Sequence, residues 1–201
     1  MIRAIIWDLG GVLVKMEDFT PHHYWEKRLR LQKGQLVKIV HNNPLGHQAL
    51  IGQIAAEDFW LDVGKQLDLS PADTVKLQTD FSKARVWDER LLALIASLKP
   101  RFKMGIISGA MSDARRIVQS QVDTDLFDVL VFSAEEGVQK PDPAIYHRTL
   151  SRLGVEAQEA IFIDDWLESV EGARRVGMHG VHYVVGVDVK EAIERIIEQE
   201  S

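Results

Sequence analysis

The sequence predicts an α/β fold: a doubly wound, five-stranded parallel sheet with an all-helical insertion after its first strand. Two observations lead to this fold class. From Lys103 onward, short apolar runs alternate with helical patterns, which is typical of βαβ units. A further apolar run at residues 3–7 stands far upstream, and the segment between has helical periodicity only.

The predicted strands are short runs rich in β-branched and other apolar residues. They are residues 3–7, Met104–Ile107, Val129–Phe132, Ile161–Ile163 and Val181–Val185. Continuous apolar runs of this length suit strands that are buried inside a parallel sheet. We therefore expect about five parallel strands with helices between them.

Capping residues mark the helices that connect these strands. Asp142 suits an N-cap with Pro143 at the first helical position, and Gly154 follows the last turn. A second helix begins near residue 168 and is closed at Gly177. The terminal helix has Asp188 as its N-cap. Its apolar face consists of Val189, Ala192, Ile193, Ile196 and Ile197.

The segment between Val14 and Asp88 is expected to contain helices and no strand. Turn signals divide it at Thr20-Pro21, Gly34, Asn42-Asn43-Pro44, Gly52 and Ser70-Pro71. Its apolar stripe fits packing better than a cofactor site. The stripe includes Leu50, Ile51, Ile54, Phe59, Trp60, Val63 and Leu67. We predict a core formed by residues 1–15 and 89–201, with residues 16–88 as a helical cap.

Composition and charge exclude several classes of protein. With 201 residues, 46% of them hydrophobic, the chain can bury a full core. Acidic residues outnumber basic ones by 30 to 24 and no basic run is present, so we expect neither a nucleic-acid nor an anionic-membrane surface. Any anionic ligand would need a locally positive pocket.

Cysteine content and hydropathy bear on the cellular compartment. The chain has no cysteine, which excludes disulfides, thiolate catalysis and thiolate metal ligands. The first strand begins at about Ile2, leaving no room for a signal peptide, and no apolar stretch approaches the roughly 18 residues of a membrane span. We therefore expect a cytoplasmic protein.

Two of the predicted strands end directly at carboxylates. Asp8 follows the first strand, and Asp164 and Asp165 follow the strand Ile161–Ile163. Residues that follow parallel strands meet in the crevice at the carboxyl edge of the sheet. Three carboxylates in one crevice repel one another and favour a divalent cation with oxygen ligands, most simply Mg²⁺.

Four short motifs occur in a consistent order along the chain. Asp8 to Val14 reads Asp-Leu-Gly-Gly-Val-Leu-Val, Ser108 ends a strand, Lys140 lies in Gln-Lys-Pro-Asp-Pro, and Asp164-Asp165 ends another strand. Together these motifs resemble the haloacid dehalogenase superfamily over nearly the whole chain. The resemblance implies a Rossmann-like core and the small helical cap of the first cap class, as in the sugar-1-phosphatase-like members.

The resemblance also implies phosphoryl-transfer chemistry. Asp8 would be the nucleophile that forms an aspartyl-phosphate, which water then hydrolyses. Ser108, with the Gly109 amide beside it, would bind a phosphate oxygen. Lys140 would hold Asp8 ionised and stabilise charge on the transferred group.

The same resemblance implies a set of Mg²⁺ ligands. They are the carboxylates of Asp8 and Asp165 and the main-chain carbonyl of Gly10. Asp164 would bind or orient the waters around the metal. Glycines at positions 10 and 11 allow a sharp turn and a close approach to a ligand.

The sequence departs from the family pattern at two glycines. Family phosphatases usually carry a second aspartate two residues after the nucleophile, where this chain has Gly10. Loss of this general acid and base costs about 10²–10⁴ in rate, least for acidic leaving groups. At Gly109 many relatives place an asparagine.

A group on the cap is one possible substitute for the missing acid. The nearby titratable residues are Glu17, Asp18, His22, His23 and His41. We favour Asp18 or His23 as the substitute. The alternative is that all five are solvated or pack within the cap.

The sequence thus leads to a Mg²⁺-dependent phosphatase that acts on a small phosphorylated metabolite. One alternative is a catalytically weak or inactive protein of the same fold that binds a ligand or regulates a partner. A haloacid dehalogenase is less favoured, because attack on carbon gives a carboxylate cluster and a metal no role. A phosphoryl-transferring mutase is also disfavoured, because it needs a proton shuttle at position 10.

Overall fold

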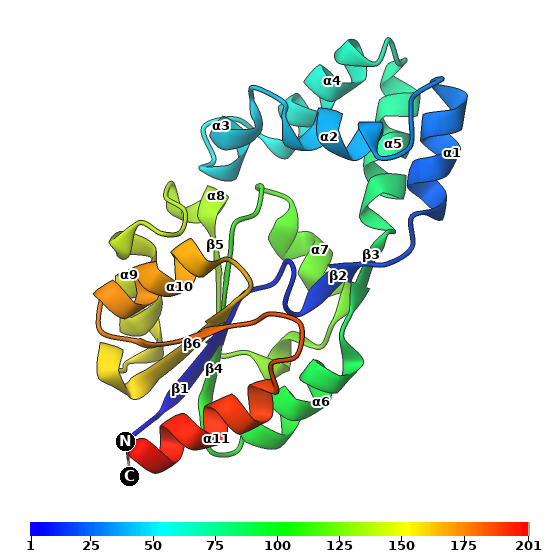
Figure 1. The fold of residues 1–201 in the computed structure, drawn as a ribbon. Helices are drawn as coiled ribbons and strands as arrows, with labels where there is room; N and C mark the ends of the chain where they lie inside the picture. The colour runs from blue at the N-terminus through cyan, green and yellow to red at the C-terminus, as the bar shows by residue number, and fades with distance from the viewer. Residues whose placement is uncertain (201) are drawn as a thin grey trace.

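A five-stranded parallel sheet forms the centre of the structure, a computed structural model that describes residues 1–200 (Figure 1). The strand order is β5-β4-β1-β6-β7. The bounds are β1 Ala4–Trp7, β4 Lys103–Ser108, β5 Val129–Phe132, β6 Ala160–Asp164 and β7 His179–His182. The predicted fold class is confirmed.

Helices cover both faces of this sheet (Figure 1). On one face lie α6 (Glu89–Leu98) and α11 (Val189–Gln199), and on the other α9 (Pro143–Leu153) and α10 (Leu167–Arg175). The remaining short elements are α7 (Ala114–Gln121), α8 (Ser133–Glu136), η1 (Thr124–Leu126) and η2 (Ala157–Glu159). Within residues 1–200, the helices are too short or too polar to cross a membrane.

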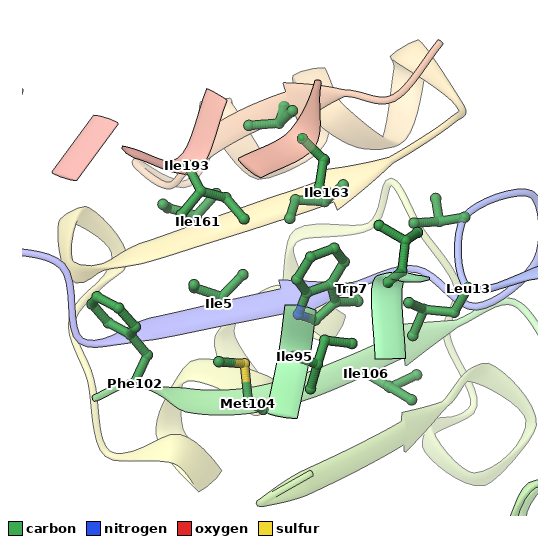
Figure 2. Packing of buried hydrophobic residues seen from close by; sticks show 14 of the residues in the cluster. Ile5, Trp7, Leu13, Ile95, Phe102, Met104, Ile106, Ile161, Ile163 and Ile193 are labelled. Carbon is green, nitrogen blue, oxygen red and sulfur yellow. The ribbon is translucent and has the colours of Figure 1, made fainter. Parts of the chain in front are cut away.

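Strand side chains alternate between two apolar layers. Ile5 and Trp7 of β1 face the layer that includes Ile95 of α6 (Figure 2), whereas Ala4 and Ile6 face the opposite layer. Because the three central strands, β1, β4 and β6, are buried on both faces along nearly their whole length, their sequences are largely apolar instead of alternating with polar residues. This explains why the strands appear in the sequence as continuous apolar runs.

The predicted caps form the expected hydrogen bonds. Asp142 accepts a bond of 2.8 Å from the amide of Ala144, and Asp188 accepts one of 2.9 Å from the amide of Lys190. These bonds satisfy amides that have no partner within the first helical turn. Gly154 ends α9 in the left-handed conformation that favours glycine, with φ at +63°.

Five helices follow the first strand and lie at the end of the molecule away from the termini (Figure 1). They are α1 Thr20–Arg28, α2 Gln35–His41, α3 Gly46–Leu50, α4 Ala56–Gln66 and α5 Pro71–Ser82. They enclose an apolar cluster of their own that includes Trp25, Phe59 and Phe81. The stripe predicted to pack contributes Phe59, Trp60 and Val63 to this cluster, as expected.

The expectation of no strand between Val14 and Asp88 is wrong. Strands β2 (Val14–Met16) and β3 (Arg85–Trp87) form a two-stranded antiparallel ribbon that joins the helices to the sheet. Each strand has only three residues, which is too short for a periodic pattern, and its partner lies far along the chain. Strand β2 crosses the first proposed boundary and β3 ends just before the second, and the division into residues 1–15 and 89–201 against 16–88 stays a prediction.

The last strand begins and ends earlier than its apolar run. The sequence predicts Val181–Val185, whereas β7 spans His179–His182. Val184 and Val185 are exposed beyond the end of the strand. The predicted position was wrong because Val184 and Val185, although apolar, follow the strand and do not enter the core.

One loop and one short helix of the α/β core contact the helical insertion. The amide of Ala56, at the start of α4, donates to Ser112 Oγ at 3.0 Å, and Met111 packs against the apolar cluster of the insertion. A second contact joins the loop after α3 to α8. There a Cβ at Gly52 would lie 2.0 Å from the carbonyl oxygen of Ala134.

The Gly52 contact leads to a stability prediction with a matched control. Gly52 and Gly34 have similar φ values of +71° and +79°, but only Gly52 faces backbone atoms, since nothing lies within 4 Å of a Cβ at Gly34. Gly34→Ala should cost roughly 1–2 kcal/mol from its left-handed backbone. Gly52→Ala should cost clearly more, because the insertion must also shift away from α8. Urea denaturation measures both, and equal losses would contradict a tight contact.

Candidate active site

The three predicted carboxylates meet at the carboxyl edge of the sheet. Trp7 of β1 pairs with Ile163 of β6, so Asp8 and Asp164 follow at neighbouring positions. The amide of Asp8 donates to the carbonyl of Ile163 at 2.8 Å, which holds the two strand ends together. One carboxylate oxygen from each of Asp8, Asp164 and Asp165 lies within 4.8 Å of the others. The strand register thus builds the carboxylate cluster.

Lys140 lies between two of these carboxylates. Its Nζ donates to Asp8 Oδ1, and to Asp164 Oδ2 at 2.5 Å. The side chains of Lys140 and Asp8 are only 8% and 7% exposed. Burial disfavours the charge on Lys140, but the carboxylates of Asp8 and Asp164 outweigh this effect and raise its pKa. Lys140 is therefore a buried cation held in place by two carboxylates.

Burial also changes the acidity of the carboxylates. It raises the pKa of Asp8 from 3.8 to about 6, although Lys140 lowers it in part, and the charge of Asp164 raises it further. Burial and the charge of Asp164 also raise the pKa of Asp165. Lys140 thus offsets part of the cost of burying the charge on Asp8. The excess negative charge favours a bound cation.

The two adjacent aspartates differ in their surroundings. Asp164 is buried, and its Oδ1 accepts a hydrogen bond of 2.7 Å from the amide of Trp166 while its Oδ2 contacts Lys140. Asp165 is exposed, and its main-chain carbonyl lies 3.0 Å from His182 Nε2. Because both oxygens of Asp164 have protein partners, Asp165 is better placed to contact a metal directly.

The glycines after Asp8 have different surroundings. Gly11 has φ at +86°, and a Cβ there would lie 2.0 Å from Asp165 Oδ2, so the backbone passes directly beside this carboxylate. At Gly10, nothing lies within 4 Å of a Cβ. The close approach of the backbone to Asp165 therefore requires a glycine at position 11. Position 10 has open space around it.

The predicted phosphate-binding residues lie at the same edge. Ser108 ends β4, next to β1, and is buried, and Gly109 follows it. Sequence analysis missed Ser133, which is fully buried; its Oγ accepts a bond of 2.9 Å from the amide of Ala110 and contacts the carbonyl of Ala110 at 3.2 Å. Ser133 thereby positions the loop after Ser108. The sequence offered one sign of this role, because Ser133 directly follows the predicted strand Val129–Phe132.

The residues considered as substitutes for the missing acid make contacts inside the insertion. Asp18 accepts a bond of 2.9 Å from the amide of Thr20, His22 is buried with its ring centroid 4.4 Å from that of Phe81, and His23 stacks on Phe19. The other two, Glu17 and His41, are exposed. Among residues 1–200, none of the five joins the carboxylate cluster.

The fold and the site together define a class of protein. The sheet extends from β1 through β4 in one direction and through β6 in the other, and ligands bind at such a switch point in open α/β sheets. Carboxylates and a buried lysine at this point are typical of an α/β enzyme. A model of the haloacid dehalogenase-like hydrolases matches residues 2–177. The chain belongs to this family of hydrolases.

Individual relatives agree with the family assignment. The chain is 29% identical to a sesquiterpene phosphatase from Aspergillus oryzae, covering 90% of this chain and 89% of the relative. It is 30% identical to a phosphatase from Mycobacterium tuberculosis, covering 88% and 85%. A crystal structure of a haloacid dehalogenase family enzyme from Bacteroides thetaiotaomicron, complexed with magnesium and inorganic phosphate, matches with a TM-score of 0.79 at 19% identity, covering 96% and 99%. This last likeness shows the fold alone.

Proposed function

We propose that this protein is a Mg²⁺-dependent phosphomonoesterase that acts on a small phosphorylated metabolite. Asp8 is the nucleophile and forms an aspartyl-phosphate. The observation that carries the proposal is the buried contact of Lys140 with Asp8 and Asp164, next to the exposed Asp165. Two relatives of similar length are named phosphatases, which supports it.

The residues at the sheet edge fit a magnesium ion. Three carboxylates offer oxygens within 4.8 Å of one another, and Mg²⁺ prefers such hard oxygen ligands. Gly11 has no Cβ, and a Cβ there would collide with the carboxylate of Asp165, so the glycine allows Asp165 to keep its position. Asp8, Asp165 and the Gly10 carbonyl would hold the ion, with Asp164 acting through water. The ion supplies positive charge that reduces repulsion between the phosphate and the carboxylates.

The protein groups have separate roles in the reaction. A carboxylate oxygen of Asp8 attacks phosphorus, and the electron pair of the broken ester bond leaves on the ester oxygen. Lys140 stabilises the negative charge on the transferred group. The Ser108 hydroxyl and the Gly109 amide hold a phosphate oxygen in line for attack.

The carboxylate cluster favours attack on phosphorus over attack on carbon. A 2-haloacid dehalogenase from Pseudomonas syringae shares the fold, with a TM-score of 0.67 at 17% identity, which does not bear on substrate. Attack on carbon gives Asp164 and Asp165 no chemical role. The second candidate function is non-catalytic ligand binding, and the observation that favours it is the missing acid at Gly10.

The substrate class follows in part from Gly10. A site without a general acid favours leaving groups that need no proton, such as acidic phenols and anomeric sugar phosphates. Relatives differ in substrate: one is a sesquiterpene phosphatase, and a glyceraldehyde 3-phosphate phosphatase from Pyrococcus abyssi is 35% identical over 42% of this chain. A substrate panel should therefore contain sugar, triose and terpene phosphates.

Release of p-nitrophenol from its phosphate tests the proposal. We expect turnover with Mg²⁺, none with EDTA, and a large loss in Asp165→Asn but not in the exposed control Asp125→Asn. Mg²⁺ at about 100 times its Kd should stabilise the wild type by about 2.7 kcal/mol and Asp165→Asn by less. Undiminished turnover in EDTA contradicts a metal role, and Mg²⁺ binding without any turnover favours the ligand-binding candidate.

A further inference from the structure

We infer from the loop at Gly10 that hydrolysis of phosphorylated Asp8 limits turnover, so that the phosphoenzyme accumulates while substrate is present. The inference rests on the proposed function. It adds a rate-limiting step and a long-lived covalent state that the assignment as a phosphatase does not specify. Three observations support it: the space at Gly10, the fixed course of the loop, and the engagement of the neighbouring titratable groups.

Gly10, two residues after Asp8, brings no functional group to the loop. No atom lies within 4 Å of a Cβ built at this residue. The loop around it is fixed, since the amide of Gly11 donates to the carbonyl of Val14 at 2.8 Å and Gly11 lies against Asp165. The space at Gly10 is therefore a fixed feature of the loop that follows Asp8, and no proton acceptor occupies it from this position.

Most titratable groups of the cluster already have protein partners, and the exposed Asp165 is the residue that would contact the metal ion. Lys140 donates to Asp8 and Asp164, and Asp164 also accepts from the amide of Trp166. His182 lies against the carbonyl of Asp165 through Nε2. In the part of the chain that the structure describes, no fourth carboxylate or imidazole joins the cluster of three. Lys140 and Asp164 are thus occupied by each other and by the backbone, and Gly10 adds no proton acceptor to the cluster.

The two half-reactions depend differently on such a group. In the first, Asp8 forms a bond to phosphorus and the ester P–O bond breaks, with the electron pair leaving on the ester oxygen. A leaving group of low pKa needs no proton at this step. In the second, a water oxygen bonds to phosphorus, the bond to Asp8 breaks and its electron pair returns to the carboxylate, while the water releases a proton to solvent.

Choice of substrate can compensate for a missing acid, but it cannot compensate for a missing base. Every substrate gives the same phosphorylated Asp8, and every hydrolysis needs the same water. General acid–base assistance is worth about 10²–10⁴ in rate, so its absence slows the second step by that factor for all substrates. With an activated substrate, the phosphoenzyme therefore forms faster than it is hydrolysed.

Rapid mixing with p-nitrophenyl phosphate and Mg²⁺ tests this inference. We expect a burst of p-nitrophenol equal in amount to the enzyme, followed by a slow steady phase. Protein quenched in acid during the steady phase should carry one phosphoryl group on the peptide containing Asp8, measured by mass spectrometry. This readout needs no variant and does not depend on the steady rate.

Two substitutions at Gly10 separate proton transfer from steric effects. Gly10→Asp adds a carboxylate and should remove the burst while raising the steady rate about 10²-fold. Gly10→Asn has the same shape without a proton acceptor and should keep the burst. Melting curves show whether both variants fold as the wild type does, as expected from the open space at this position.

Each outcome distinguishes this inference from the proposed function. Steady turnover without a burst and without phosphorylated protein overturns the inference but leaves a phosphatase. Loss of the burst in Gly10→Asn as well as in Gly10→Asp also overturns it, since proton transfer would then not be the cause. Absence of p-nitrophenol from the wild type and both variants rejects the phosphatase itself.

Discussion

Asp8→Asn should lower turnover by on the order of 10⁴-fold or more while making the metal-free protein more stable at pH 7. The loss of turnover follows from removing the nucleophile. The gain in stability follows from burial, which raises the pKa of Asp8 to about 6 and makes its charged form unfavourable in the folded protein. The neutral amide removes a penalty on the order of 2–3 kcal/mol.

The raised pKa of Asp8 also predicts how the stability of the metal-free protein changes with pH. Because the pKa of Asp8 is raised on folding, the folded state holds the proton more tightly, and stability falls as pH rises from 3.8 through about 6. Denaturant titrations of metal-free protein at pH 4 and pH 7 should show this fall in the wild type and a smaller one in Asp8→Asn. The exposed control Asp125→Asn should follow the wild type. Equal pH dependence in all three proteins would contradict a destabilising charge on Asp8.

Lys140→Met should destabilise the metal-free protein by roughly 3–5 kcal/mol and remove turnover. The substitution leaves Asp8 and Asp164 buried without the cation that both contact. The double variant Lys140→Met with Asp8→Asn should recover part of the lost stability, because one of the two buried charges is gone. Urea denaturation of the four proteins in this cycle measures the coupling.

A surface lysine provides the control for this cycle. Lys15 donates to Asp88 at 2.9 Å, but its side chain is 31% exposed. Ion pairs in contact with water contribute about 1 kcal/mol or less. Lys15→Met should therefore cost far less than Lys140→Met. Similar costs for the two variants, or no recovery in the double variant, would show that Lys140 does not compensate buried charge.

The sheet was predictable because its central strands are buried on both faces. Burial makes β1, β4 and β6 largely apolar runs, and the caps at Asp142 and Asp188 act through bonds to amides two and three residues away. Such local signals can be recognised in one sequence. The β2–β3 ribbon was not predictable, because three-residue strands derive their stability from a distant partner and have no pattern of their own.

The carboxylate cluster was predictable for a topological reason. Residues that directly follow parallel strands meet at one edge whatever their separation in sequence, which brought Asp8 to Asp164 and Asp165. The sequence does not reveal that Gly11 lies against the carboxylate of Asp165 whereas Gly10 does not, because this depends on the course of the loop. Ser133 and Ser112 were missed because their partners, the amides of Ala110 and Ala56, lie far along the chain and only the fold brings them together.

The bond from Ala56 to Ser112 gives the first turn of α4 a cap that belongs to the other part of the molecule. Residue Ala55, at the N-cap position, has no side chain able to serve instead. A missing cap costs a helix about 1 kcal/mol. A displacement of the insertion from the loop at Ser112 would remove this cap and leave an amide of the first turn of α4 without its partner. The order of this helix end therefore depends on the contact between the two parts of the molecule.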